Sequence, residues 1–407
     1  MRTNPPQAPA PGNSVTRVEH KIDALTALRF LAAILVVLYH RGVFAIAAVS
    51  PLAARPAQIG FIAVGFFYTL SGFVLTIVYA QRKMDRATFY FSRFARIYPL
   101  YLLALVLSLP GYLTKWHSGE VGVLQGAGAL ILAPLLLQAW YPPTTLVWNG
   151  PGWSLSCEAF FYFIFPFLLP RFLKLEEKSL LPVVGGCWMA SLLPSFVFHL
   201  CNGWTSASVE VAQAARIPTT FNYWMDLVSF HPLARTPEFL AGMAIGCLLI
   251  RERPSNAVRK GTILVAVSVA LLFTTAATAE MIPASILHNG LLLPVWLMLI
   301  TGFYWGGFPG RLLSVWPLVA LGEISYAMYI LQSPVSGYLG VALRPILHQS
   351  FIGQYPNLYA LALYIIVLTM VSAFSYRYFE KPMRDFVNRR WQRARSRSAI
   401  PTTSQGT

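Results

Sequence analysis

The sequence predicts an all-α polytopic membrane protein of about ten transmembrane helices plus one re-entrant segment, with both termini in the cytoplasm. The composition points to this class first, because 56% of the 407 residues are hydrophobic and only 11% are charged. Soluble proteins carry about 25% charged residues. The mean hydropathy of +0.57 agrees. Eleven apolar runs also follow one another, at about residues 25–49, 60–80, 97–114, 123–140, 153–173, 180–201, 236–250, 261–279, 286–307, 314–341 and 357–378.

The net charge of +16 would suit a nucleic-acid-binding protein, but its distribution argues against that class. The basic residues fall in short connectors between apolar runs, as the positive-inside rule predicts for cytoplasmic loops. Three regions are strongly basic: the connector after the second run, the connector after the seventh run, and the C-terminal segment. Their basic residues are Arg82, Lys83, Arg86, Arg93 and Arg96; Arg251, Arg253, Arg259 and Lys260; and Arg377, Lys381, Arg384, Arg389 and Arg390.

These cytoplasmic regions limit how many runs can cross the membrane. An odd number of crossings must separate the outer end of the third run from the basic connector at 251–260, yet four runs lie between them. The fourth run, 123–140, is short, rich in glycine and contains Pro134. Such a segment suits a re-entrant loop packed against protein. Ten spans then remain, and no internal repeat typical of secondary transporters is evident.

The two ends of the chain and the cysteines complete the organisation. We expect residues 1–22, rich in proline and alanine and without a signal-peptide core, to form a disordered cytoplasmic tail. Residues 387–407 are expected to form a basic disordered tail, which leaves 23–386 as the membrane domain. The four cysteines form no C-x-x-C pair and lie in or beside apolar runs, so we interpret them as small core residues: Cys157, Cys187, Cys201 and Cys247.

The first apolar run carries an arginine and a histidine where lipid favours apolar groups. Arg29 and His40 are eleven residues apart, so a helix presents both on nearly the same face, about 16 Å apart along its axis. Ionisable groups inside a span are functional by default. The alternative is that Arg29 snorkels to the inner interface and His40 is an ordinary interfacial histidine.

Arg93 and Arg96 are three residues apart and therefore share one helix face. They are either positive-inside anchors or a guanidinium pair that binds the phosphates of an anionic cytosolic cofactor.

The fifth run opens with Trp153, which suits an interface anchor, and continues with a polar stripe at intervals of four residues: Ser154, Glu158 and Tyr162. A carboxylate one turn inside a span needs a partner. Because this run and His40 share the outer side, we expect Glu158 to orient and charge-stabilise His40. Glu238 and Glu323 are two more carboxylates in apolar runs, either functional or paired structurally with a buried hydroxyl or arginine.

Together these segments resemble the integral-membrane acyltransferase family 3, whose members O-acylate bacterial cell-surface and exported polysaccharides. Seven elements match in order over about residues 23–386: Arg29-x10-His40; Phe66-Phe67-Tyr68-Thr69-Leu70-Ser71-Gly72-Phe73; Arg93-x-x-Arg96-Ile97-Tyr98-Pro99; Trp153-Ser154-Leu155-Ser156-x-Glu158; Pro237-Glu238-Phe239-x-x-Gly242; Gly322-x-x-Ser325-Tyr326-x-x-Tyr329; and Phe379-Glu380-Lys381-Pro382. Two positions depart from the family pattern. Gly65 stands where an acidic residue is common, and Gln332 where a histidine is common. The acid/base role therefore falls on His40. We also expect a stand-alone member without the esterase-like domain of many relatives.

The resemblance implies a membrane O-acyltransferase that uses acyl-CoA, most simply acetyl-CoA, and no metal. Arg29, Arg93 and Arg96 would hold the CoA phosphates. His40 would act as general base or carry the acyl group as an acyl-imidazole, assisted by Glu158. Candidate substrate or oxyanion contacts are Ser71, Trp153, Ser154, Glu238, Glu323, Ser325 and Tyr326.

The implied acceptor is a sugar hydroxyl of an exported or lipid-linked polysaccharide, and the implied location is the inner (plasma) membrane, alongside polysaccharide synthesis or export machinery. Nucleic acid is not an expected partner. Two other functional classes stay open. A transporter or flippase would use the intramembrane His, Arg and Glu residues as a proton or substrate path. A structural partner in a synthesis complex would have no activity of its own.

Overall fold

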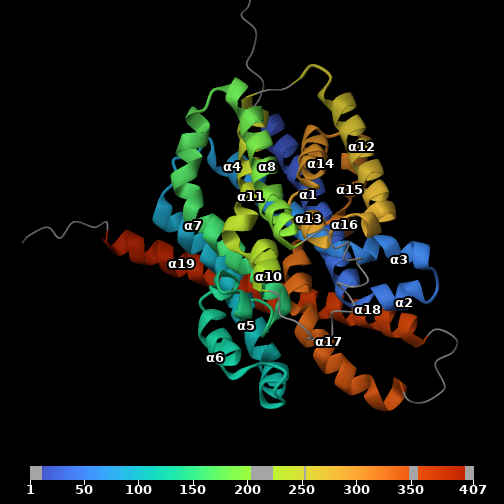
Figure 1. The fold of residues 1–407 in the computed structure, drawn as a ribbon. Coiled ribbons are helices and arrows are strands. Elements are labelled where there is room, and N and C mark those ends of the chain that lie inside the picture. Colours follow the sequence, from blue (N-terminus) through green and yellow to red (C-terminus); the bar gives the residue numbers. More distant parts are fainter. Residues whose placement is uncertain (1–11, 203–222, 252–253, 348–355, 399–407) are drawn as a thin grey trace, which may run out of the picture.

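The computed structural model describes residues 12–202, 223–251, 254–347 and 356–398, which consist of helices, turns and connectors without a β-strand (Figure 1). The predicted all-α fold is confirmed. The α-helices are α1 (Gly12–Arg41), α2 (Val43–Ala47), α3 (Pro51–Gln58), α4 (Ala63–Tyr79), α5 (Arg86–His117), α6 (Val123–Leu132), α7 (Trp153–Lys174), α8 (Glu177–Asn202), α10 (Tyr223–Phe230), α11 (Pro232–Arg251), α12 (Ala257–Thr278), α13 (Ala284–His288), α14 (Leu293–Trp305), α15 (Phe308–Leu313), α16 (Trp316–Glu323), α17 (Ser325–Leu347), α18 (Pro356–Ser375) and α19 (Lys381–Ser398). Shorter turns are η1 (Gly60–Ile62), η2 (Gln138–Trp140), η3 (Pro142–Thr144), η4 (Gly150–Gly152), η5 (Ala279–Met281) and the π-helical η6 (Tyr376–Glu380).

Within the described ranges, nine helical segments are long and apolar enough to cross a membrane, against about ten expected. The difference lies in the predicted run 314–341. Ile324 interrupts this run and separates the eight-residue α16 from α17. Helix α17 has the length of a span, but Gln332, Ser333 and Pro334 make it less apolar than the other nine.

The fourth apolar run does not form a spanning helix. Helix α6 has ten residues, or about 15 Å, which is half of a membrane core. The chain from 133 to 152 then folds back against α5 and α7 in short turns. Tyr101 donates a hydrogen bond to the carbonyl of Ala133 at 2.6 Å, and Ser156 donates to that of Leu136 at 2.6 Å. This architecture agrees with the expected re-entrant segment, whose depth in a bilayer stays a prediction.

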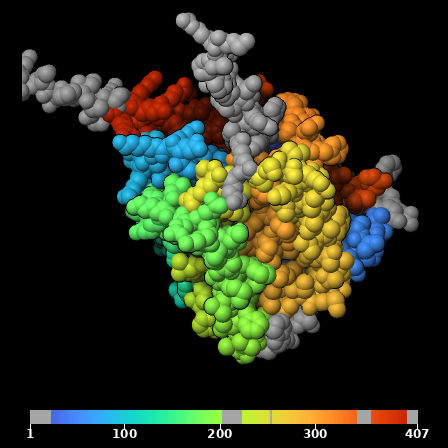
Figure 2. Space-filling model, turned by 90° about the horizontal axis from the view of Figure 1, so that it is seen from above, coloured from blue at the N-terminus to red at the C-terminus, as the bar shows by residue number. Residues whose placement is uncertain are grey.

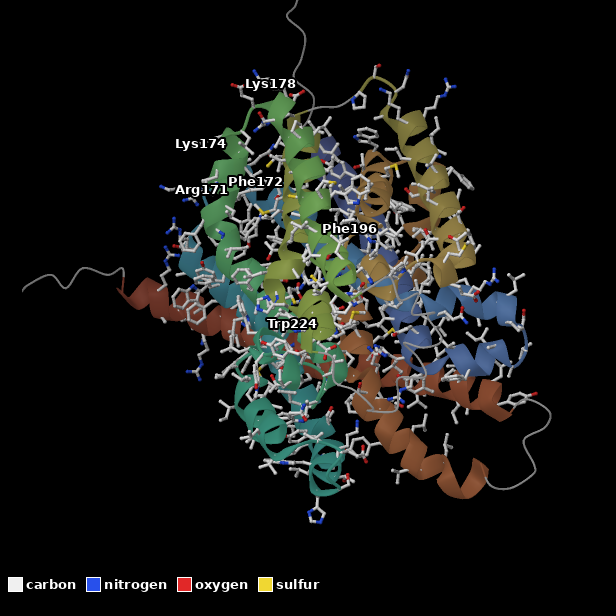
Figure 3. All side chains as sticks on the ribbon, in the orientation of Figure 1. Arg171, Phe172, Lys174, Lys178, Phe196 and Trp224 are labelled. Atoms are coloured by element: carbon white, nitrogen blue, oxygen red, sulfur yellow. The ribbon has the colours of Figure 1, made fainter. Side chains whose placement is uncertain are left out.

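Contacts between connectors agree with the predicted sidedness. The guanidinium of Arg251 at the end of α11 donates to the carbonyls of Leu173 and Leu175, at 2.8 and 2.7 Å. The α7–α8 and α11–α12 connections therefore lie at one end of the molecule, where Figure 3 labels Arg171, Lys174 and Lys178.

The C-terminal helix returns to the start of α5, as Figure 2 shows for the red and light-blue segments. Arg395 forms an ion pair with Asp85 at 2.6 Å, and the rings of Trp391 and Phe91 stack with centroids 3.8 Å apart. The connector at 80–85 and the C-terminal segment, both expected in the cytoplasm, are thus neighbours.

Three expectations need correction. Helix α1 begins at Gly12, so residues 12–22 are helical; residues 1–11 of the expected N-terminal tail lie outside the described ranges. Helix α19 runs to Ser398, so 387–398 form no disordered tail, because this segment docks on α5. All four cysteines are free, and Cys157 and Cys247 are buried, but Cys187 is half-buried and Cys201 is exposed on α8. The error at Cys201 arises because much of α8 faces outward.

Two matching sequence motifs pack directly against each other where α4 crosses α11. A Cβ atom added at Gly72 would lie 2.1 Å from the carbonyl oxygen of Phe239, and one at Gly242 would lie 2.0 Å from that of Thr69. Only glycine allows the two backbones to approach this closely. The crossing fixes α4, which supplies one wall of the cavity described next.

Candidate active site

A cavity of about 140 Å³ lies between α1, α4, α5, α7 and α17, and we call it the arginine cavity. Most of its wall is apolar, but polar side chains from five separate sequence motifs converge there. The polar lining residues are Arg29, Ser71, Arg93, Arg96, Ser154, Glu158, Tyr162, Ser325 and Tyr326, with Tyr68 and Tyr329 beside them. The structure therefore brings eight of the twelve predicted site residues to one place.

Three guanidinium groups dominate the charge of the arginine cavity. Arg29 comes from the middle of α1, and Arg93 and Arg96 come from one face of α5. The Arg93 guanidinium lies 5.9 Å from the ring centroids of both Phe89 and Tyr162. Such a cluster suits a polyanion, since each guanidinium offers several planar N–H donors.

Glu158 partly neutralises this cluster. It accepts a hydrogen bond from Tyr162, one turn along α7, and interacts electrostatically with Arg29. Its predicted partner was His40, which does not line the arginine cavity. The structure thus places Glu158 beside Arg29, on the same cavity wall as Ser154 and Tyr162.

A second carboxylate reaches the cluster from a part of the chain that the sequence did not single out as a site. Glu380, at the end of the π-helical turn η6, is 6% exposed and interacts with Arg96, Arg384 and Arg29. The signal available in the sequence was a carboxylate at the end of the last apolar run, in the matched element Phe379-Glu380-Lys381-Pro382. Glu380 ends a π-helical turn, a feature that occurs often at functional sites.

The hydroxyl groups of the arginine cavity are mostly engaged already. Ser154 donates to the carbonyl of Pro151 at 3.0 Å, and Tyr329 donates to the Ser154 hydroxyl at 2.8 Å. Tyr326 donates to the carbonyl of Ile97 at 2.5 Å, and Ser325 to that of Gly322 at 2.7 Å. Ser71 differs, because its hydroxyl has no hydrogen bond to any described residue.

His40 lies further along α1, on the same face as Arg29. Between them on that face are Ala33, Val36 and Val37, which are 0%, 1% and 0% exposed. His40 itself is half-buried, with its ring centroid 5.1 Å from that of Tyr39. Packed apolar side chains therefore separate His40 from the outer end of the arginine cavity.

Trp153 and Glu238 lie one layer behind the cavity wall. Tyr68 lines the cavity, and its ring contacts Trp153 on one side, at 6.3 Å between centroids, and the Arg235 guanidinium at 5.4 Å. Arg235 forms a fully buried ion pair with Glu238 at 2.9 Å. The structure therefore gives Glu238 the buried arginine partner that its structural interpretation requires.

Arg235 holds further groups in this layer. It donates to Asn289 Oδ1 at 2.7 Å, contacts His288 Nδ1 at 3.2 Å and hydrogen-bonds the His288 carbonyl.

Glu323, by contrast, is exposed at the end of α16 and does not line the cavity. Among the described residues, no group of three or more His, Cys, Asp or Glu side chains is placed to hold a metal ion.

Comparison with known proteins agrees with the family resemblance that the sequence motifs indicate. A family model for an acyltransferase domain (Acyl_transf_3) matches residues 22–376. The acyltransferase MdmB of Streptomyces mycarofaciens is 30% identical over 334 residues, which cover 78% of this chain and 80% of MdmB. No solved structure matches the chain.

Two O-acetyltransferases are more distant relatives. The peptidoglycan O-acetyltransferase OatA of Listeria monocytogenes is 25% identical over 92% of this chain and 58% of its own length. The O-acetyltransferase OatA of Staphylococcus aureus is 22% identical over 89% of this chain and 57% of its own length. The chain therefore spans less than two thirds of either OatA protein.

Proposed function

The chain belongs to the acyltransferase 3 family, and from that premise we propose that it moves an acyl group, in the simplest case acetyl, from cytosolic acyl-CoA to a sugar hydroxyl of an exported or lipid-linked polysaccharide. A multi-pass membrane O-acyltransferase agrees with the family, with the O-acetyltransferase relatives and with the apolar helices of the described residues. The observation that carries the finer proposal is the convergence of Arg29, Arg93 and Arg96 on one cavity.

The arginine cavity suits the phosphates of an acyl-CoA. Guanidinium groups bind phosphates through paired N–H donors, and three of them match a donor with several phosphate groups. Helix α5 starts at the connector expected in the cytoplasm, so Arg93 and Arg96 lie within its first three turns from that side. In the unliganded protein Glu158 and Glu380 would balance this charge until the phosphates replace them.

Helix geometry supports a place for Ser71 at the donor end of the proposed path. A Cβ atom at Gly60 would lie 2.7 Å from the Tyr39 side chain, so these two residues are level. Ser71 is eleven residues further along α4 and Arg29 ten residues back along α1, which puts both about 15 Å from that level. The Ser71 hydroxyl is therefore suited to hydrogen-bond the pantetheine arm of CoA, and not the oxyanion of a reaction at His40.

The thioester must travel along α1 to reach His40. We infer that the pantetheine arm displaces the packing of Val36 and Val37, which separates His40 from the cavity. His40 would then accept the proton of the acceptor hydroxyl as that oxygen attacks the thioester carbonyl, and CoA leaves as its thiolate. In the second route, the imidazole takes the acyl group first and passes it to the hydroxyl. The proposal also includes the plasma (inner) membrane as the location and polysaccharide synthesis or export machinery as neighbours.

The test compares wild type with His40→Ala and with His117→Ala, which changes an exposed histidine at the end of α5. We expect purified wild-type protein to consume acetyl-CoA in the presence of a glycan acceptor. His40→Ala should lose 10²–10⁴-fold of this rate, the usual contribution of a general base, and His117→Ala should retain it. NMR of the glycan would then identify the acetylated position. Equal rates for wild type and His40→Ala would refute the role of His40, and uphill glycan uptake without acyl turnover would favour a transporter.

A further inference from the structure

A second cavity, which we call the apolar groove, lies on another face of α1. It has a volume of about 310 Å³ and is walled by α1, α3, η1, α4, α12, α14 and α15. Leu28, Ala32 and Leu35 line it from α1. Each of them directly precedes a residue of the Arg29–His40 face, namely Arg29, Ala33 and Val36. On α4, Ala63 lines the groove whereas Val64 lines the arginine cavity. Helices α1 and α4 therefore form the wall between the two cavities.

The lining of the apolar groove is hydrocarbon throughout. Aromatic and aliphatic side chains such as Phe273, Trp296 and Phe303 form its sides, and small residues such as Ala32 and Ala276 make room between them. Its walls belong mainly to candidate membrane spans. A polar ligand would lose its hydrogen bonds to water in this groove without replacement, so a hydrocarbon chain is the chemistry that fits.

One cation lies at an end of the groove. Arg55 on α3 donates a hydrogen bond from Nη1 to the carbonyl of Ala277 at 3.2 Å, and the adjacent residues Pro56 and Ala276 both line the groove. Figure 1 shows α3 next to the end of α12 where this contact forms. Glu280 is exposed a few residues further on, and no ion pair joins it to Arg55 among the described residues. The remaining N–H groups of Arg55 are available to an anion.

The same end of the groove adjoins the predicted catalytic histidine. Ile59 lines the groove, and Gly60 is so close to α1 that a Cβ atom would lie 2.2 Å from the carbonyl oxygen of Leu35 and 2.7 Å from Tyr39 Cβ. Tyr39 directly precedes His40. The predicted topology places this connector outside, where the positive-inside rule disfavours an arginine such as Arg55. An arginine at this position suits the binding of an anionic ligand.

We propose that the apolar groove holds the first isoprene units of the hydrocarbon tail of a polyprenyl-phosphate carrier, with its phosphate at Arg55 and its attached sugar near His40. This inference rests on the proposed function, because it specifies the acceptor as a lipid-linked sugar. A guanidinium at the end of this apolar groove matches an anionic headgroup on a long hydrocarbon chain. The location next to His40 argues for a substrate in place of an ordinary bilayer lipid.

The test measures binding of undecaprenyl phosphate to purified full-length protein by native mass spectrometry, with phosphatidylglycerol as the comparison lipid. Arg55→Gln removes the cation, and Ala276→Phe fills the groove. Val267→Phe is the matched control, because Val267 is exposed on α12 and does not line the groove. We expect wild type and Val267→Phe to bind undecaprenyl phosphate equally. We expect Arg55→Gln to bind it about tenfold more weakly, the size of one charged hydrogen bond, and Ala276→Phe to lose it.

Two results would overturn the proposal: phosphatidylglycerol bound as tightly as undecaprenyl phosphate, or unchanged binding in both groove variants. Acetyl transfer to a soluble sugar acceptor and to a lipid-linked one, measured on the same samples, separates this proposal from the proposed function. Wild type that acetylates neither acceptor contradicts the proposed function, while the binding data still decide the groove. Wild type that acetylates both, with Ala276→Phe unaffected, contradicts the groove alone.

Discussion

The crossing of α4 and α11 allows a prediction whose size follows from the structure. A Cβ atom at Gly72 would lie 2.1 Å from the Phe239 carbonyl oxygen, whereas ordinary contacts begin at 3.4 Å, so the helices must separate by about 1.3 Å. Both colliding atoms are fixed to the backbone, so no rotamer change relieves the overlap. Overpacking of this kind costs about 1–3 kcal/mol. We therefore expect Gly72→Ala to destabilise the protein by at least about 2 kcal/mol.

The assay is thermal unfolding in detergent, and the measured quantity is the fraction of protein that stays monodisperse after heating. Donor binding should fall together with stability, because Ser71, directly before Gly72 on α4, and Tyr68, one turn earlier, line the arginine cavity. Gly185→Ala is the control, since a Cβ atom at this position in α8 would meet nothing within 4 Å. Alanine there should gain helix stability by up to about 1 kcal/mol. If Gly72→Ala unfolds at or above the temperature of Gly185→Ala, the inferred close packing of α4 on α11 is wrong.

Three further predictions concern charged groups. Arg96→Gln should weaken CoA binding about 10–100-fold by isothermal titration, as expected for one charged contact to phosphate. The surface variant Arg171→Gln should bind CoA normally. An equal loss in both variants would indicate that CoA is attracted only by the net positive charge. Glu380→Gln removes a negative charge beside the guanidinium cluster and should tighten CoA binding several-fold, whereas weaker binding would mean that Glu380 positions Arg96 for the donor. Hydrogen bonds from Thr88, together with Arg395, lower the pKa of the Asp85 carboxyl below its usual value. This stabilising cap is present above the ordinary Asp pKa near 3.9 and is lost as the pH falls through the lowered value. Hydrogen-exchange protection factors in the first turn of α5, which are corrected for the intrinsic exchange rate at each pH, should therefore fall at low pH in wild type and at neutral pH in Asp85→Ala. Unchanged protection in that variant would contradict the role of the cap.

Local periodicity predicted the parts of the site that depend on a single helix. The shared face of Arg29 and His40 follows from their spacing, and the burial of Ala33 and Val36 between them agrees. The pair Arg93 and Arg96 likewise needed only the geometry of α5. The Arg235–Glu238 ion pair has the same i, i+3 spacing and was available in the sequence. It was missed because Arg235 comes before the start assigned to the seventh apolar run.

Relations between helices could not be read in this way, and Glu158 shows why. The sequence predicts that the start of α7 and the end of α1 lie on the same outer side. A contact between Glu158 and His40 follows from this only if α7 starts at the membrane surface. The chain before α7 instead folds into the bundle, where Gln138 donates to the carbonyl of Gly152 at 2.8 Å and Ser156 bonds back to Leu136. Helix α7 therefore begins against the folded-back chain, and Glu158 interacts with Arg29.

The separation of His40 from the arginine cavity has a chemical reason in a membrane enzyme. A permanently open path lined by three guanidiniums would conduct anions and admit water to the thioester, which would hydrolyse the donor without an acceptor. Closed packing of Val36 and Val37 prevents both as long as the cavity is empty. If Arg93 and Arg96 bind the CoA phosphates as proposed, that binding energy would be available to open the packing, and donor binding and access to His40 would become one event. In the proposed mechanism, the distance between the arginines and the histidine would keep the acyl group shielded until the whole donor is bound.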